Sequence, residues 1–202
     1  MKMTIPHSRE ILEFHDRSLA QPGRLDSASA EQKHGAWPYI ELNHRCNCAL
    51  WKEEDQARRR DVPDSAIAAN KRAIDAHNQK RNDAIEKTDE FLLAQLEAVE
   101  RRADARLHSE TAGAMIDRLS ILALKIFHMR LQTERSDASP EHIQTSEARL
   151  ARLTEQRADL AACLDALISD CRAGRAWFKV YRQFKMYNDP AYNPYLYGAK
   201  RG

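Results

Sequence analysis

The chain has 202 residues, of which 43% are hydrophobic and 31% charged, with only 6 glycines and 7 prolines. This length suits one domain with a sizeable core, and the scarcity of glycine and proline favours helices over a β-sandwich or β-barrel with many turns. The 32 basic and 30 acidic residues are mixed along the chain and leave a net charge of +2, which argues against a nucleic-acid-binding protein.

The distribution of apolar residues indicates a protein of the cytoplasm. The N-terminal segment has no continuous apolar stretch followed by small residues, so it does not resemble a secretory signal. A bilayer-spanning helix needs ~20 apolar residues, and the densest apolar stretch, residues 121–127, is interrupted by Lys125. We therefore expect a cytoplasmic protein without a membrane span.

Apolar periodicity and breaker residues predict helices over residues 8–20, 38–60, 62–107, 112–131 and 140–173. Residues 21–36 have no periodic apolar face and are predicted to form a flexible loop. An aromatic and basic C-terminal segment, residues 175–202, follows Gly174, and its aromatics recur about every three residues, which predicts a short sixth helix. The predicted fold is all-α, with one domain over residues 1–202: an elongated antiparallel bundle of five to six helices with long central helices.

Local signals mark the starts of the last two predicted helices. Thr111 is a capping residue, and Ser139 followed by Pro140 is typical of a helix start. The turn after Thr111 contains Gly113, which leaves backbone N–H groups open to a bound phosphate or carboxylate. The favoured interpretation is the other one, in which Gly113 permits close packing of two helices.

The third predicted helix carries polar residues within its apolar stripe. At 100° per residue, Asn78 and Arg81 fall on the same narrow arc as Ile74 and Ile85, and Asn82 lies at its edge. Such a block of amides and charges is either a satisfied buried network or a ligand site.

Three other predicted helices share this feature. Asn47 and Glu54 lie on one stripe with Trp51, and Asp117 belongs to a helix that is apolar on nearly all sides. Arg157 occupies a heptad seam position where leucine would be expected. Repetition of the feature in several helices favours a ligand site over a purely structural bundle.

These polar groups predict a site inside the bundle that binds an anionic small molecule, such as a nucleotide, a sugar nucleotide or a sugar phosphate. Arginines would bind the phosphates and amides would bind the hydroxyl groups. Basic residues beside the C-terminal aromatics would complete the site. The predicted ligand-binding residues are Asn47, Glu54, Asn78, Arg81, Asn82, Asp117, Arg157, Arg182 and Lys185.

Two alternatives stay open. The first is a non-catalytic helical adaptor or assembly subunit, in which buried polar residues fix the pairing of helices. The second is a Mg²⁺-dependent all-α nucleotide phosphohydrolase, in which Glu86 and Asp89, spaced as ExxD, would hold the metal with Glu54. No ExxE motif accompanies this ExxD, so the sequence assigns no cofactor. The oligomeric state is open as well, a homo-oligomer included.

Five blocks of sequence are similar to those of a bacterial family that is known as a domain of unknown function, number 4254. The blocks are NCALWKEEDQAR, KRAIDAHNQKRNDAIEKTDEFLL, SETAGAMIDRLSILALKIFHM, QRADLAACLDAL and FKVYRQFKMYNDPAYNP, within residues 40–197. The resemblance implies no catalytic residue. It implies a loose association with envelope-glycan glycosyltransferases, so a link to envelope-glycan metabolism is an expectation.

Overall fold

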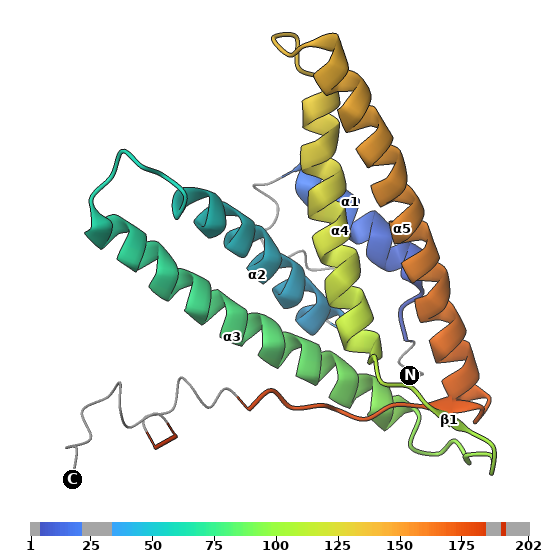
Figure 1. Ribbon diagram of the computed structural model, residues 1–202. Coiled ribbons are helices and arrows are strands. Elements are labelled where there is room, and N and C mark those ends of the chain that lie inside the picture. The colour runs from blue at the N-terminus through green and yellow to red at the C-terminus, as the bar shows by residue number, and fades with distance from the viewer. Residues whose placement is uncertain (1–4, 22–33, 185–190, 193–202) are drawn as a thin grey trace.

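The computed structural model describes residues 5–21, 34–184 and 191–192 (Figure 1). In chain order these form α1 (Ser8–Ala20), α2 (Trp37–Gln56), α3 (Asp64–Gln95), β1 (Arg106–Leu107), α4 (Ala112–Thr133), α5 (Pro140–Arg172) and β2 (Ala176–Trp177). The all-α prediction is confirmed. None of these helices is long and apolar enough to cross a bilayer. Most of the predicted 21–36 loop, namely residues 22–33, lies outside the described residues.

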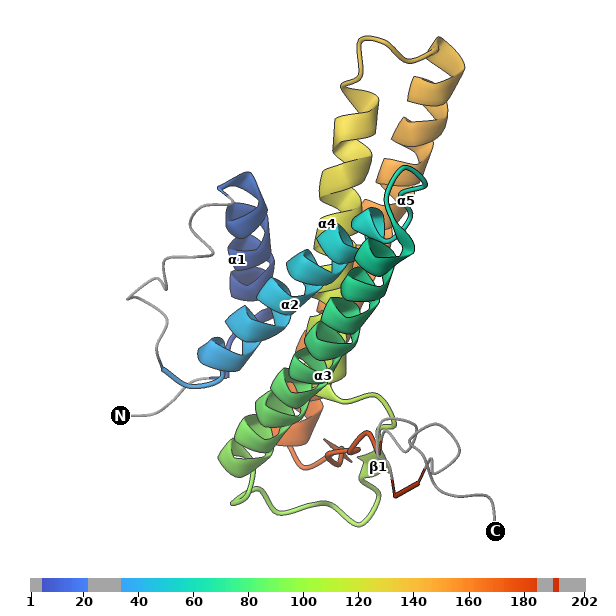
Figure 2. The same ribbon diagram turned by 90° about the vertical axis from the view of Figure 1, so that its left-hand side faces the viewer.

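Two antiparallel hairpins make up most of the structure. α2 pairs with α3, α4 pairs with α5, and the hairpins lie together where α3 ends and α4 begins. Towards the turns at residues 57–63 and 134–139 they diverge into a fork, as Figure 1 shows. α1 packs against α4 and α5 (Figures 1 and 2). The predicted antiparallel bundle is therefore closed at one end only.

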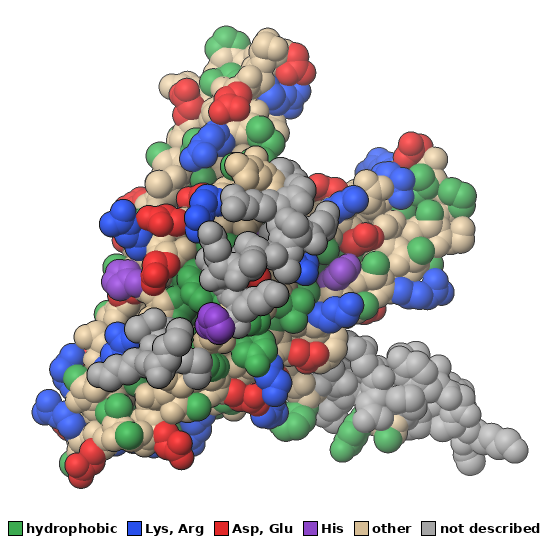
Figure 3. All heavy atoms as spheres, turned by 180° about the vertical axis from the view of Figure 1, so that it is seen from behind, with side chains coloured by type: hydrophobic (Ala, Val, Ile, Leu, Met, Phe, Trp, Pro, Cys, Tyr) green, Lys and Arg blue, Asp and Glu red, His purple; other side chains and the backbone are tan. Residues whose placement is uncertain are grey.

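The apolar core fills the closed end of the fork. Every helix contributes to it, and Ile11, Ile40, Leu92, Leu119 and Leu164 are all at most 2% exposed. Burying an aliphatic side chain of this size contributes about 1.5–3 kcal/mol, so the closed end supplies much of the stability. On the face seen in Figure 3, acidic and basic side chains are interspersed, in line with the small net charge.

The third helix ends at Gln95, well before its predicted end at residue 107. Its continuation pairs with the chain after α5 instead: the N–H groups of Arg106 and His108 donate to the carbonyls of Arg175 and Trp177 (2.9 and 2.8 Å). β1 and β2 thereby form a short parallel pair. The backbone groups are satisfied by a distant segment, and this pairing overrides the helix propensity of residues 96–107.

The prediction of a sixth helix is wrong for the described residues 176–184. This segment begins with β2 and contains no helix. Burial alternates over residues 176–180, where Ala176 and Phe178 are buried and Lys179 is exposed, and residues 181–184 are all exposed. This period of two is that of an extended chain, in which successive side chains point to opposite sides. The aromatic spacing of about three was therefore a misleading signal.

The start of α4 shows why Gly113 is a glycine. Thr111 caps the helix, as predicted, by accepting a hydrogen bond from the Ala114 N–H (3.1 Å). The Gly113 N–H donates to Asp89 Oδ1 of α3 (2.6 Å), so a carboxylate of the chain itself occupies the helix start. A Cβ at position 113 would lie only 2.6 Å from the Ile85 carbonyl oxygen. Close packing of α3 and α4 therefore explains this glycine, and the start of α4 offers no open anion seat.

Gly113→Ala should lower the free energy of unfolding by about 2 kcal/mol, because the new methyl group forces the backbones of α3 and α4 apart. Urea denaturation of the two proteins measures the change. Helix propensity alone would give the opposite sign, a gain of about 1 kcal/mol. A more stable variant would therefore contradict the close approach.

Candidate functional site

Polar side chains of α2, α3 and α4 form one buried network, and Asp117 is its centre. Asp117 Oδ1 accepts hydrogen bonds from Asn43 Nδ2 (2.8 Å) and Asn47 Nδ2 (2.9 Å). Arg81 Nε of α3 lies 4.0 Å from the same oxygen. Three of the predicted residues, Asn47, Arg81 and Asp117, therefore lie together inside the bundle. Asn43 joins them because it lies one turn before Asn47 on α2.

The network continues between α2 and α4 into a cluster that the residue pattern does not predict. Asn47 Nδ2 also donates to Ser120 Oγ (3.0 Å), and Ser120 Oγ lies 2.7 Å from His44 Nδ1. The side chains of Asn43, His44, Asn47 and Ser120 are at most 4% exposed. Such a chain of satisfied buried groups fixes how two helices pair, which is a structural role.

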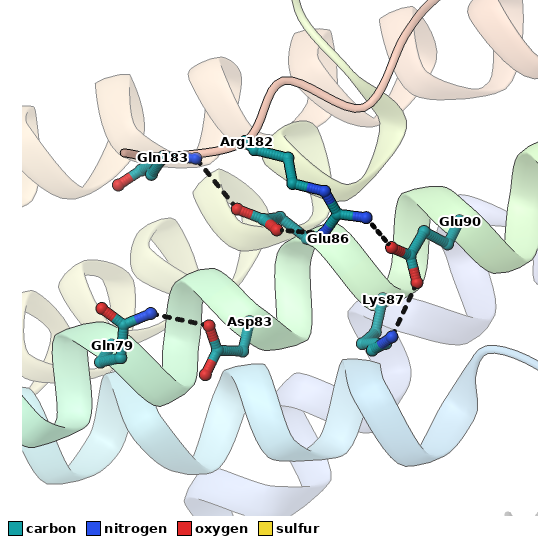
Figure 4. Close-up of polar contacts among 7 residues, drawn as sticks. All are labelled: Gln79, Asp83, Glu86, Lys87, Glu90, Arg182 and Gln183. Atoms are coloured by element: carbon teal, nitrogen blue, oxygen red, sulfur yellow. Dashed lines mark hydrogen bonds and ion pairs between the residues drawn. The ribbon is translucent and has the colours of Figure 1, made fainter. Parts of the chain in front are cut away.

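Each predicted arginine has an internal carboxylate near it. Arg81 lies by Asp117, and Arg157 Nη1 pairs with Asp16 Oδ1 of α1 (2.8 Å). Arg182 lies between two carboxylates of α3, Glu86 (2.7 Å) and Glu90, as Figure 4 shows. The arginines thus neutralise charges of the chain itself at three separate places. They do not surround one common space.

The other predicted residues are scattered. Glu54 forms an exposed ion pair with Arg58, one turn further along α2 (3.1 Å). Asn82 Nδ2 donates to Gln183 Oε1 (2.7 Å), and Asn78 is half-buried one turn before Asn82 on α3. Lys185 lies outside the described residues.

The three carboxylates proposed for a metal do not converge. Glu86 accepts from Arg182 and Gln183, Asp89 accepts from Gly113, and Glu54 faces Arg58. Within the ranges that the structure describes, no three His, Cys, Asp or Glu side chains are placed to hold a metal ion. Burial raises the pKa of Asp89 to about 6, against hydrogen bonds from Thr111 and Gly113 that favour the charged form.

A second candidate is an open groove in the fork, between the end of α2 and the α4–α5 hairpin. Its volume is about 970 Å³. We call it the fork groove. It is lined by Trp51 and Asp55 of α2, by Lys125, His128, Met129 and Gln132 of α4, and by Gln144, Thr145, Ala148, Arg149, Arg152, Leu153 and Gln156 of α5.

An aromatic stack forms one wall of the fork groove. The rings of Trp51 and His128 are nearly parallel, at 3°, with centroids 4.4 Å apart. Burial lowers the pKa of His128, so the imidazole is mainly neutral at pH 7 and stacks as an aromatic ring. The wall therefore offers flat apolar surface beside polar groups, which suits a ring or a sugar face.

The fork groove carries positive charge that no carboxylate of the described residues pairs with. Lys125, Arg149 and Arg152 have no carboxylate partner in the described part of the chain. The one acidic lining residue, Asp55, lies 3.7 Å from Arg58 and so has a cation of its own. Three free cations at the rim of a groove attract an anionic ligand.

One family model covers both candidate sites. The model described as "Protein of unknown function (DUF4254)" matches residues 37–180. The chain belongs to the DUF4254 family. The match spans the Asp117 network and all residues of the fork groove, whereas α1 precedes it. No curated protein and no solved structure matches the chain. The function of this DUF4254 protein has to be argued from its own residues.

Proposed function

We propose that this DUF4254 protein acts in the bacterial cytoplasm and binds an anionic small molecule in the fork groove: a nucleotide, a sugar nucleotide or a sugar phosphate. The observation that carries the proposal is the set of three unpaired cations, Lys125, Arg149 and Arg152, around an aromatic wall. Arginine binds phosphate through parallel N–H donors, and a stacked Trp51 offers a face to a base or sugar ring.

The fork groove is a better ligand site than the Asp117 network. The amides of Asn43 and Asn47 are used between helices and are at most 4% exposed. Arg81 Nε has no hydrogen-bond partner among the described residues, but it lies by the Asp117 carboxylate of the chain itself. The fork groove is open, and its volume of about 970 Å³ is that of a site for a drug-sized ligand. The ligand class predicted from the sequence is kept, but the site moves from the bundle interior to the fork.

The ligand class includes sugar nucleotides, which carry both a ring and a diphosphate. A sugar nucleotide would fill the groove with its base on the Trp51 wall and its phosphates near Arg149 and Arg152. It would also fit the link to envelope-glycan metabolism that the family resemblance implies.

The adaptor hypothesis is the second candidate, and one observation favours it. The α4–α5 hairpin projects past the core, and Leu131 near its tip is 44% exposed. A hairpin that projects from the core is accessible to another protein, and Leu131 would be covered in such a contact. In this case the buried polar network would only fix how the helices pair.

A thermal-shift panel separates the two candidates. The panel contains UMP, UDP, UDP-glucose, ADP, glucose 1-phosphate and inorganic phosphate, each with and without Mg²⁺. A ligand that binds only the native state raises the melting temperature by mass action. We expect at least one phosphate ester to do so. A rise that requires Mg²⁺ would revive the phosphohydrolase hypothesis.

Arg149→Ala/Arg152→Ala should weaken the binding of the best ligand by at least about 10-fold, because two charge-assisted contacts are lost. Arg135→Ala is the matched control: Arg135 lies at the turn of the same hairpin, pairs with Asp137 (2.8 Å) and does not line the groove. The control should bind like the wild type. Equal loss in both variants, or no response to any ligand, would favour the adaptor.

A further inference from the structure

A pair of buried histidines joins α1 to α2. His15 of α1 is 0% exposed, and its ring stacks on His44 of α2 with centroids 4.5 Å apart and planes at 29°. Neither ring nitrogen of His15 has a hydrogen-bond partner among the residues that the structure describes. Leaving a buried polar side chain unsatisfied is unfavourable, so this arrangement needs a reason.

In the described part of the chain, no acceptor lies within hydrogen-bond distance of either His15 ring nitrogen. From α2, Cys48 Sγ lies 3.7 Å from His44 Nε2, and from α4, Ser120 Oγ contacts His44 Nδ1. From α5 comes Arg157, whose guanidinium engages the carboxylate of Asp16 on α1. Arg157, whose charge acts on both rings, is a cation, and its carboxylate partner Asp16 is engaged in the ion pair.

These surroundings keep both imidazoles neutral. Burial lowers the pKa of His15 well below its usual range and the pKa of His44 to about 4, and the Arg157 charge lowers both. When α1 separates from α2, the histidines meet water and regain ordinary pKa values near 6.5. Protons therefore favour the separated state.

The C-terminal end of α1, one turn after His15, supports the fork groove. Leu19 forms a small apolar cluster with Ala123 and Leu124 of α4, and Trp51 packs against this cluster. Trp51 is the residue that stacks on His128 in the groove wall. Displacing α1 would remove Leu19 and loosen the wall.

We infer that α1 is a proton-opened latch on the fork groove: protonation of the stacked His15–His44 pair detaches α1 and removes its support of Trp51. The latch itself rests on the histidine geometry, and its coupling to a ligand rests on the proposed function. A ligand that needs the intact wall holds the latch closed, because the effect of opening on binding and of binding on opening is reciprocal.

The expected size of the effect follows from proton linkage. A histidine that stays neutral in the closed state and has a pKa of 6.5 in the open state favours opening about tenfold per pH unit below 6.5. From pH 7 to pH 5, one such histidine favours opening roughly 25-fold, and two favour it several hundred-fold.

Amide hydrogen exchange of the ligand-free protein tests the latch. Protection factors, corrected for the intrinsic pH dependence of exchange, are compared at pH 7 and pH 5 for the wild type and His15→Phe. The phenyl ring keeps the stack on His44 and removes one protonation site. We expect protection of α1 to fall several hundred-fold in the wild type and roughly 25-fold in the variant, while α1 stays less protected than α3 at both pH values, which marks an opening short of global unfolding.

Three results would overturn the latch: no pH effect on α1, the same fall in both proteins, or equal protection factors for α1 and α3 at pH 5, which would mean that α1 opens only by global unfolding. The coupling is measured separately with UDP-glucose, whose phosphates carry the same charge at both pH values. At about 100 times its Kd, this probe should slow α1 opening about 100-fold. If UDP-glucose binds and α1 exchange stays the same, the coupling is wrong. If it does not bind, the proposed function fails for this probe and the exchange result still decides the latch.

Discussion

Replacing Asp117 with alanine should lower the free energy of unfolding by about 4 kcal/mol. The change leaves the buried amide groups of Asn43 and Asn47 without their acceptor and removes the carboxylate closest to Arg81. A buried donor without a partner costs about 1–3 kcal/mol, and breaking a buried charge pair costs more. Urea denaturation monitored by circular dichroism measures the loss.

Asp75→Ala is the control for this experiment. Asp75 lies on α3 and pairs with Lys71, with both side chains about half exposed, so its loss should change stability by less than ~0.5 kcal/mol. The double variant Asn47→Ala/Asp117→Ala should lose less unfolding free energy than the sum of the losses in the two single variants. The reason is that the two side chains share one hydrogen bond, which either change alone removes. An Asp117→Ala protein within 1 kcal/mol of the wild type would show that the network does not hold α2 on α4.

The second large effect is a loss of stability with rising pH that depends on Asp89. Its pKa is about 6 in the folded protein and 3.8 when unfolded, so between these values the folded state holds a proton that the unfolded state releases. Stability from this group is complete below pH 3.8 and is lost as pH rises through 6. The total change is about 3 kcal/mol, since one pKa unit corresponds to about 1.4 kcal/mol.

The buried histidines change stability in the opposite direction, because their folded pKa values are lowered. The difference in unfolding free energy between the wild type and Asp89→Asn cancels their contribution. This difference is measured by urea denaturation from pH 4.5 to pH 7. Over this range the wild type should lose about 2 kcal/mol of unfolding free energy relative to Asp89→Asn. A difference that is constant with pH would mean that Asp89 is charged throughout, held by the start of α4.

Local signals were sufficient for most of the fold. The caps at Thr111 and Ser139 are decided by residues within one turn, and both helices begin where the sequence predicts. The end of α3 and the conformation of residues 176–184 are decided by pairing across the chain, as between Arg106 and Arg175. A local sequence pattern does not identify such a distant partner. The predicted helix end at residue 107 and the predicted sixth helix were therefore both wrong.

The same limit applies to the candidate site. A polar residue on an apolar helix face is predicted to be buried, and Asp117, Asn47 and Arg81 lie in one network. The pattern does not predict the partner of such a residue. Arg157, for example, pairs with Asp16, which is 141 residues away in the chain. Arg149 and Arg152 are exposed positions on α5, and only the divergence of the two hairpins turns them into the rim of a groove.

The most direct test of ligand binding in the fork groove uses Trp51 as its reporter. Trp37→Phe/Trp177→Phe leaves Trp51 as the only tryptophan of the three in the chain. Titration with UDP-glucose, or with the best ligand of the panel, should quench its fluorescence saturably. Arg149→Ala/Arg152→Ala in the same background should need at least about 10 times more ligand. Fluorescence of Trp51 that does not change up to millimolar ligand, or that saturates equally in both proteins, would contradict binding in this groove.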